Sequence, residues 1–296
     1  MSGIDIDRSV LLVGGHDAGK SNYVGRLWLG LRRGDGLLAV PEDPEQIEYV
    51  ETLIAEIRQG RYAGRTDLDG EARNFEGTSL VQGGSLKGLK TRILVPDVAG
   101  ELWERTSSDR ELDADWIDRI ERCSGALLFL RFGSKHHVPA LDWVTSAELM
   151  RTPLARAVQK SQIASQIFLT DMLNLLDLHL GKRLRDVKPR VSVVVAAWDA
   201  IPPDEQAAGP FAYIQRTYPM FAGRLADRGR LDAKAFGTSI TGGDLVNEAH
   251  RAEFLASDAE EEGYVVYEGR DGQMVERRDL TIPVAWALGV ELPEAA

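Results

Sequence analysis

The sequence has little cysteine and no long apolar segment. Its 296 residues include one cysteine, Cys123, which excludes an internal disulfide framework and a cluster of thiolate metal ligands. The longest apolar runs, at residues 127–130 and 193–198, are far shorter than the roughly 20 residues that a membrane helix needs. The first residues lack the basic and apolar stretches of a secretory signal. We therefore expect a cytoplasmic protein without a membrane-spanning segment.

Positive charge is also scarce. The chain has 35 Lys plus Arg residues against 46 Asp plus Glu residues, a net charge of −11. An acidic chain has no general affinity for nucleic acid or anionic lipid, although it can still bind a phosphate group locally. The five histidines do not follow a zinc-binding spacing such as H-E-x-x-H, and the G-x-S-x-G turn of many hydrolases is absent. We expect neither nucleic acid nor a membrane as a partner.

Short apolar runs rich in β-branched residues alternate with longer helix-like segments. This order is typical of a mostly parallel sheet with helices on both faces. We therefore predict an α/β fold of three layers. Strands are expected at residues 10–13, 73–81, 91–95, 125–132, 191–198 and 235–240, and helices at 20–33, 47–57, 113–122, 168–179 and 213–228.

The domain organisation is expected to be simple. Residues 1–255 are predicted to form one domain with a helical insertion at about 133–190. After the acidic run at residues 258–262, which we interpret as a solvated face, an alternating segment is expected to form a hairpin that turns at Asp271 and Gly272. The hairpin and a short helix around residues 284–288 are predicted to form an appendage over 256–296.

A glycine-rich motif carries the strongest chemical signal. Residues Gly14 to Ser21, GGHDAGKS, match G-x-x-x-x-G-K-[ST] and lie between a predicted strand and a predicted helix. Glycines let backbone N–H groups converge on phosphates, and the amino end of the helix adds positive potential. Lys20 would reach the β- and γ-phosphates, while the Ser21 hydroxyl would ligate Mg²⁺. The motif predicts a P-loop NTPase fold; a glycine-rich turn without a ligand is the alternative.

A second motif, D-x-x-G from Asp97 to Gly100, follows the predicted strand at residues 91–95. A carboxylate at this strand end can hold the metal ion of a nucleotide bound by the glycine-rich loop. With both motifs in this order, the sequence resembles the translation-factor-like class of P-loop GTPases, which contains the Ras-like small GTPases. The resemblance spans roughly Val10 to Gly243.

The resemblance assigns roles near the γ-phosphate. Asp97 would bind Mg²⁺ through water, and the N–H of Gly100 would contact the γ-phosphate. Glu101 occupies the position of a water-positioning Gln, and His16 occupies a position where many small GTPases have Gly. An ionised Glu only accepts hydrogen bonds, and a side chain at His16 would crowd the attacking water, so we expect slow hydrolysis.

Base recognition is only partly present. The N-K-x-D motif of the family aligns with Ala196 to Asp199, where the aspartate alone is kept. Asp199 would accept hydrogen bonds from the N1 and N2 groups of guanine. Trp198 would either stack on the base or belong to the core. The stretch Gly237 to Ile240 resembles the last family motif, whose backbone meets the base carbonyl.

The switch threonine of the family must lie between the first helix and the strand at residues 73–81. Thr66, in a glycine-rich segment, is the first choice, and Thr78 is the second. Arg65 would be either an arginine finger or a solvated side chain.

The predicted site residues fall into three groups. The residues expected to bind the nucleotide are Gly14, Gly15, His16, Asp17, Ala18, Gly19, Lys20, Ser21, Asn22, Gly100, Trp198, Asp199, Ser239 and Ile240. Those expected to act in hydrolysis are Lys20, Glu101 and Thr66. Those expected to hold Mg²⁺ are Ser21, Thr66 and Asp97.

The region after residues 125–132, the incomplete base motif and the added tail are similar to bacterial GTPases of the double-GTPase type, which are predicted in prokaryotic conflict and defence systems. This resemblance implies a GTP-binding molecular switch that binds GTP or GDP with Mg²⁺. Loops near Thr66 and Gly100 would be read by a regulatory or effector protein. A hydrolysis-deficient, nucleotide-bound assembly protein and a P-loop ATPase are the alternatives.

Overall fold

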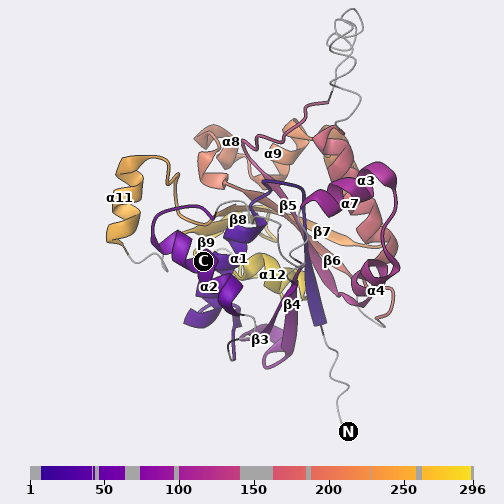
Figure 1. The fold of residues 1–296 in the computed structure, drawn as a ribbon, viewed down its shortest axis with the longest axis horizontal. Helices are drawn as coiled ribbons and strands as arrows, with labels where there is room; N and C mark the ends of the chain where they lie inside the picture. Colours follow the sequence, from indigo (N-terminus) through magenta and orange to yellow (C-terminus); the bar gives the residue numbers. More distant parts are fainter. Residues whose placement is uncertain are drawn as a thin grey trace, which may run out of the picture.

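The computed structural model describes residues 8–41, 43, 47–63, 74–96, 100–140, 163–184, 188–227, 229–257 and 262–294. Within these residues the strands form one nine-stranded sheet in the order β2-β3-β4-β1-β5-β6-β7-β8-β9 (Figure 1). The strands are β1 (Arg8–Val13), β2 (Leu38–Ala39), β3 (Asn74–Val81), β4 (Lys90–Pro96), β5 (Gly125–Arg131), β6 (Arg190–Ala196), β7 (Asp232–Ser239), β8 (Tyr264–Glu268) and β9 (Met274–Arg277).

The central strands of the sheet are parallel, and the strands at its two edges are antiparallel. Strands β4, β1, β5, β6 and β7 run parallel to one another, with Leu12 opposite Leu127 and Leu128 opposite Val193. Strands β2 and β3 continue the sheet antiparallel beyond β4, as β8 and β9 do beyond β7. The carboxyl ends of the parallel strands lie at one edge, where ligands of such sheets bind. The described parts of the predicted motifs, at residues 14–21, 198–199 and 239–240, lie at this edge.

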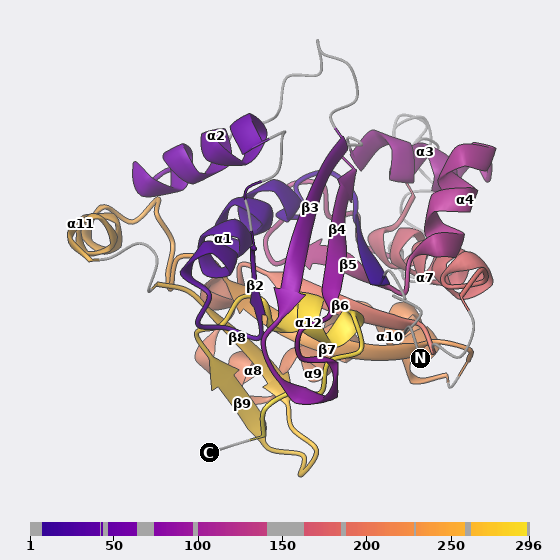
Figure 2. The same cartoon turned by 90° about the horizontal axis from the view of Figure 1, so that it is seen from below.

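Helices cover both faces of the sheet, because successive side chains of a strand point to opposite faces. In β1, Val10 and Leu12 pack in one apolar cluster with α1, α2 and α12, whereas Leu11 and Val13 pack in a second cluster with α3, α4, α7 and α9. Figure 2 shows α1 on one side of the strands and α4 and α7 on the other. The helices are α1 (Lys20–Arg33), α2 (Ile47–Arg58), α3 (Gly100–Asp109), α4 (Ala114–Arg122), α7 (Ser165–His179), α8 (Pro203–Ala207), α9 (Pro210–Thr217), α10 (Pro219–Ala226), α11 (Glu248–Ala256) and α12 (Ile282–Ala287).

The predicted α/β fold of three layers is confirmed. The helix α7 lies between β5 and β6 in the chain and buries Leu169, Met172, Leu173 and Leu176 against the sheet. It therefore serves as the crossover helix of two parallel strands as well as part of the predicted insertion. Among the described residues, no helix has both the length and the apolar character to cross a membrane.

The predicted helix at residues 213–228 is interrupted. Helix α9 ends at Thr217 and α10 begins at Pro219, with Tyr218 between them at φ −133° and ψ 62°. Proline has no N–H to donate, and its ring disfavours the helical conformation of the residue before it. The single helix expected from the apolar spacing is therefore two short helices.

The C-terminal hairpin is continuous with the main sheet. Strand β8 pairs with β7, and β9 pairs with β8 around the expected turn at Asp271 and Gly272. Helix α12 packs beneath the central strands, where the Ser192 hydroxyl donates a hydrogen bond of 2.7 Å to the Pro283 carbonyl oxygen. A Cβ atom on Gly125 would lie only 2.2 Å from the Ala287 carbonyl oxygen. This segment is thus built into the core, although the division of the chain at residue 255 stays a prediction.

Candidate functional site

The glycine-rich loop joins the end of β1 to the start of α1. Gly14 lies against β5, since a Cβ atom there would come within 3.0 Å of the Phe129 carbonyl oxygen. Gly19, just before α1, has a left-handed φ of 88°, and its Cβ atom would lie 3.0 Å from the Cβ atom of Ala196 in β6. Glycine adopts this φ without strain. The two glycines therefore let the loop pass close to the ends of β5 and β6.

Lys20, the first residue of α1, turns its side chain back into the loop. Its Nζ atom donates hydrogen bonds to the carbonyl oxygens of Gly14 and Gly15, the latter at 3.0 Å. An ammonium group thus lies beside the first residues of the loop, at the amino end of a helix. A positive charge at the positive end of a helix dipole is the arrangement that suits a bound polyphosphate.

Of the three residues predicted to hold Mg²⁺, the structure describes Ser21. It is the second residue of α1 and is half-buried. Its hydroxyl oxygen is a suitable ligand for a hard cation, so this part of the donor set fits Mg²⁺. Thr66 and Asp97 lie outside the described residues, as does Arg65. In the part of the chain that is described, no group of three or more His, Cys, Asp or Glu side chains is arranged to hold a metal ion.

Asn22 connects the start of α1 to the segment that follows α2. Its Oδ1 atom accepts a hydrogen bond of 2.7 Å from the backbone N–H of Ala63. Ala63 is the last described residue before the segment that contains Thr66. The contact therefore holds the approach to the predicted switch threonine beside the phosphate loop.

Asp17 directs its carboxylate toward the end of β5 and the loop that follows it. Its φ of 53° lies in the left-handed region, which Asp tolerates better than most residues. The Oδ1 atom pairs with Arg131 at 2.5 Å, and Oδ2 accepts longer hydrogen bonds of 3.3 Å from the Ser134 hydroxyl and the Lys135 N–H. This ion pair offsets the negative charge of Asp17 within the glycine-rich loop. The sequence motif names Asp17 but not its partners.

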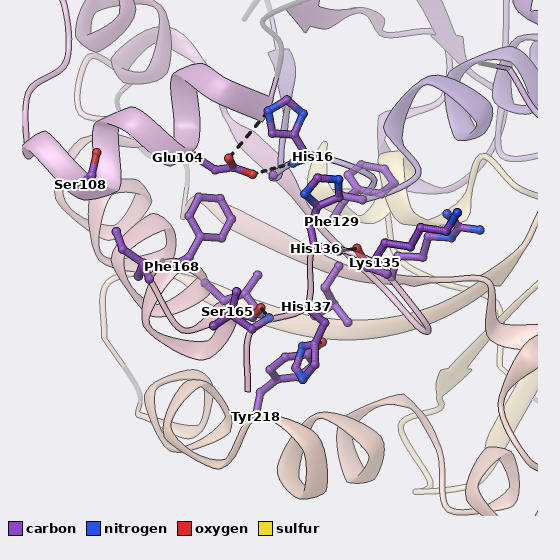
Figure 3. A pocket seen from close by; sticks show the side chains of 18 of the residues that line it. His16, Glu104, Ser108, Phe129, Lys135, His136, His137, Ser165, Phe168 and Tyr218 are labelled. Carbon is purple, nitrogen blue, oxygen red and sulfur yellow. Dashed lines mark hydrogen bonds and ion pairs between the residues drawn. The ribbon is translucent and has the colours of Figure 1, made fainter. Parts of the chain in front are cut away.

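Glu104 brings helix α3 to the phosphate loop. Gly100 and Glu101 are the first two residues of α3, and Glu104 lies one turn further along. Its Oε1 atom accepts a hydrogen bond of 3.0 Å from the backbone N–H of His16, and Oε2 lies 3.7 Å from His16 Nε2 (Figure 3). Glu104 was not predicted from the sequence, because an exposed acidic residue gives no signal of a contact with a residue far away in the chain.

Trp198 belongs to the core. Its side chain is 1% exposed, and the indole ring lies over Gly237 in β7, where a Cβ atom would come within 2.3 Å of the ring. The ring also meets Tyr213 edge-on at a centroid distance of 6.2 Å. This is the core alternative of the sequence analysis; in this conformation the ring has no open face for a base.

Asp199 follows Trp198 at the carboxyl edge of the sheet and is half-buried. Its negative charge acts on two tyrosines from distant parts of the chain. Burial raises the pKa of Tyr264 to about 12, and the charge of Asp199 adds to this shift. Burial likewise raises the pKa of Tyr62, with a smaller contribution from Asp199.

The loop after β7 is fixed from α1 by Arg26. This arginine is 2% exposed, and its Nε atom donates a hydrogen bond of 3.1 Å to the Ile240 carbonyl oxygen. The Ser239 hydroxyl accepts a hydrogen bond of 3.0 Å from the Gly242 N–H. The helix that starts at the phosphate loop thus also holds the predicted base-side backbone. A basic residue inside the apolar pattern of the helix at 20–33 was the available signal for this role.

A cavity of about 390 Å³ opens beside the phosphate loop. It is bounded by that loop, α3, the loop after β5 and α7, and Figure 3 shows His16, Glu104, His136 and Phe168 around it. The rings of His16 and His136 lie 5.6 Å apart. Its lining includes both apolar and titratable side chains.

Three solved structures are similar to the chain. A chain of the signal recognition particle receptor SRb-GTP/SRX complex from Chaetomium thermophilum has 16% identity, covers 83% of this chain and 97% of its own, and gives a TM-score of 0.35. The GTPase-like domain of S. cerevisiae Ski7, bound to GDP and inorganic phosphate, has 11% identity, covers 85% of this chain and 50% of its own, and gives a TM-score of 0.33. Bacterial selenocysteine-specific elongation factor EF-Sec has 10% identity, covers 84% of this chain and 28% of its own, and gives a TM-score of 0.29. No curated protein matches the chain.

The family assignment comes from a match over most of the sequence. The model of the Double-GTPase 1 family matches residues 11–287. The matched region begins in β1, contains the whole phosphate loop, and extends through the C-terminal hairpin to α12. It confirms the resemblance to P-loop GTPases of the double-GTPase type. The chain therefore belongs to the Double-GTPase 1 family.

Proposed function

We propose that the protein is a molecular switch that binds GTP with Mg²⁺ in the loop from Gly14 to Ser21. The observation that supports it most directly is the return of the Lys20 ammonium group into a glycine loop at the amino end of α1. Backbone N–H groups, a helix amino end and an ammonium group together favour a polyphosphate. Membership of a GTPase family makes a guanine nucleotide the expected occupant.

Base selection in this proposal depends on Asp199. A carboxylate that accepts hydrogen bonds from both guanine N–H groups would be left without partners by adenine. The backbone of Ser239 and Ile240 lies on the neighbouring strand end, held by Arg26, and would contact the base carbonyl. Trp198 would support this edge from the core rather than stack on the base.

The switch itself would use the segments around Thr66 and Gly100. Thr66, Asp97 and Ser21 would share the Mg²⁺ ion, and α3, which begins at Gly100, would follow the state of the γ-phosphate. A regulatory or effector protein would read the difference. We propose a role in prokaryotic conflict systems on the resemblance alone, and a cytoplasmic location on the composition of the sequence.

The nucleotide carried by freshly purified protein tests the proposal. The protein is denatured and the released nucleotide is separated by ion-pair chromatography beside standards. We expect GDP or GTP in near-stoichiometric amount. An adenine nucleotide in its place would favour the ATPase alternative, and protein that is free of nucleotide and binds neither GTP nor ATP would refute the proposal.

Intrinsic hydrolysis is expected to be slow. Glu101 replaces a neutral amide by a carboxylate, and His16 adds a side chain to the loop, so turnover should stay at or below about 10⁻⁴ to 10⁻³ per second without a partner. Single-turnover hydrolysis by purified protein measures the rate, and Glu101→Gln should increase it. A rate near one per second would contradict the slow switch. A rate at the uncatalysed level in both proteins would favour the second candidate, a nucleotide-bound assembly protein.

A further inference from the structure

Glu104 places a carboxylate directly on the phosphate loop. Its Oε1 atom accepts the His16 backbone N–H at 3.0 Å and packs so closely that a Cβ atom on Gly15 would lie 3.2 Å from it. The side chain is 45% exposed and comes from α3, whereas the loop belongs to the β1–α1 connection. A carboxylate from one element thus uses a donor that belongs to another.

This contact bears on phosphate binding because loop N–H groups are donors for anions. The Lys20 ammonium group lies at the carbonyl oxygens of Gly14 and Gly15, immediately beside His16. A lysine of such a loop binds the β- and γ-phosphates, so the terminal phosphate of a triphosphate lies nearest to this end of the loop. The Glu104 carboxylate and the terminal phosphate would therefore be neighbouring negative charges.

We propose that Glu104 discriminates between GTP and GDP: its carboxylate stays on the His16 N–H when a diphosphate is bound, and a γ-phosphate displaces it and so releases α3 from the loop. The proposal rests on the proposed function, because it assumes that a guanine nucleotide occupies the loop. Glu104 acts as a specificity-determining residue here, without a part in bond cleavage.

The surroundings of Glu104 allow this displacement. The adjoining cavity of about 390 Å³ gives the side chain a space to enter, and the His136 ring and the Ser108 hydroxyl border that space. The later part of α3 is anchored, since the Ser107 hydroxyl donates a hydrogen bond of 2.8 Å to Asp171 of α7. Loss of the loop contact would thus change the end of α3 next to the nucleotide more than the end packed on α7.

The test separates charge from shape. Glu104→Gln keeps a carbonyl oxygen that accepts the His16 N–H but removes the negative charge. Affinities for GDP and for a non-hydrolysable GTP analogue are measured by titration calorimetry on nucleotide-free full-length protein, with Glu111→Gln, an exposed carboxylate just after α3, as the matched control. We expect Glu104→Gln to raise the ratio of GTP-analogue to GDP affinity by about tenfold, because a like charge close to the terminal phosphate is removed. The ratio of Glu111→Gln should equal that of the wild type.

Two results would overturn the inference. A ratio in Glu104→Gln within twofold of the wild-type ratio, with both nucleotides still bound, would refute the role of Glu104 and leave the proposed function intact. Wild-type protein that binds neither nucleotide would refute the proposed function and this inference with it.

Hydrogen exchange gives a second measurement. In the wild type, amides at the start of α3 should exchange faster with the GTP analogue than with GDP. In Glu104→Ala, which removes the contact altogether, exchange with GDP should already be fast. Equal exchange with both nucleotides in the wild type would contradict the release of α3.

Discussion

At the phosphate end of the proposed site, three residues of the glycine-rich loop have partners within the chain, whereas at the base end one of the two predicted side chains belongs to the core. Lys20 returns to the loop carbonyl groups, Asp17 pairs with Arg131, and Glu104 accepts the His16 N–H. At the base end, Trp198 is buried, and Asp199 is the predicted residue that offers a carboxylate. For the proposed function, this difference predicts that the phosphates supply most of the binding free energy and that Asp199 decides the base.

The largest expected effect is at Lys20. Lys20→Ala removes the ammonium group that would face the phosphates, so affinity for GDP and GTP should fall by about a hundredfold or more, ~3 kcal/mol. Titration calorimetry measures the loss, and far-UV circular dichroism checks that the fold is kept. The exposed Lys182, at the end of α7, offers a matched control, and Lys182→Ala should bind like the wild type. Unchanged affinity in Lys20→Ala would contradict a phosphate-dominated site.

The substitution Gly237→Ala tests whether Trp198 is a core residue. The added methyl group would meet the buried indole ring at 2.3 Å, so we expect the free energy of unfolding to fall by ~2 to 3 kcal/mol. Urea denaturation measures this change. Gly223→Ala, at an exposed position of α10 with open space for a methyl group, should instead be neutral or raise stability by up to ~1 kcal/mol. A Gly237→Ala protein as stable as the wild type would show that the Trp198 ring can move out of the core. Stacking of this ring on a base would then remain an alternative.

Asp199→Asn should weaken nucleotide binding less than Lys20→Ala does and should have the clearest effect on base selectivity. The amide offers one acceptor oxygen where the carboxylate offers two, so the preference for GTP over ATP should weaken by ~1 to 3 kcal/mol. Competition between GTP and ATP measures it. Asp204→Asn, an exposed carboxylate in α8, is the control for the change in charge. If the base preference is the same in Asp199→Asn and in the wild type, the base end works through other groups.

Features that depend on neighbouring residues in the sequence, such as the glycine-rich loop and the buried strands, were predictable. The loop from Gly14 to Ser21 has a spacing that only a few backbone conformations satisfy, and β5 and β6 are continuous apolar runs typical of buried parallel strands. Helix α3 was not predicted, because its buried face includes Thr106 and Ser107 beside Trp103 and thus lacks an apolar period.

The contacts that complete the site are of long range and were not predictable. Glu104 meets a residue 88 positions away, and Arg26 meets Ile240 across 214 positions. Nothing in the neighbourhood of either side chain in the sequence specifies such a partner. The position of β8 in the sheet was not predictable for the same reason. A hairpin signal predicts the turn but not the strand with which the hairpin pairs.

The placement of α12 has a consequence for how the chain folds during its synthesis. Val284 of α12 is fully buried in the same cluster as Val10, and the Arg8 guanidinium donates a hydrogen bond of 2.6 Å to the Leu288 carbonyl oxygen. The ribosome therefore releases the phosphate loop and every nucleotide motif long before the residues that close this layer. Until then the part of the apolar face that α12 covers stays exposed, so the nascent chain is more prone to aggregation during this period.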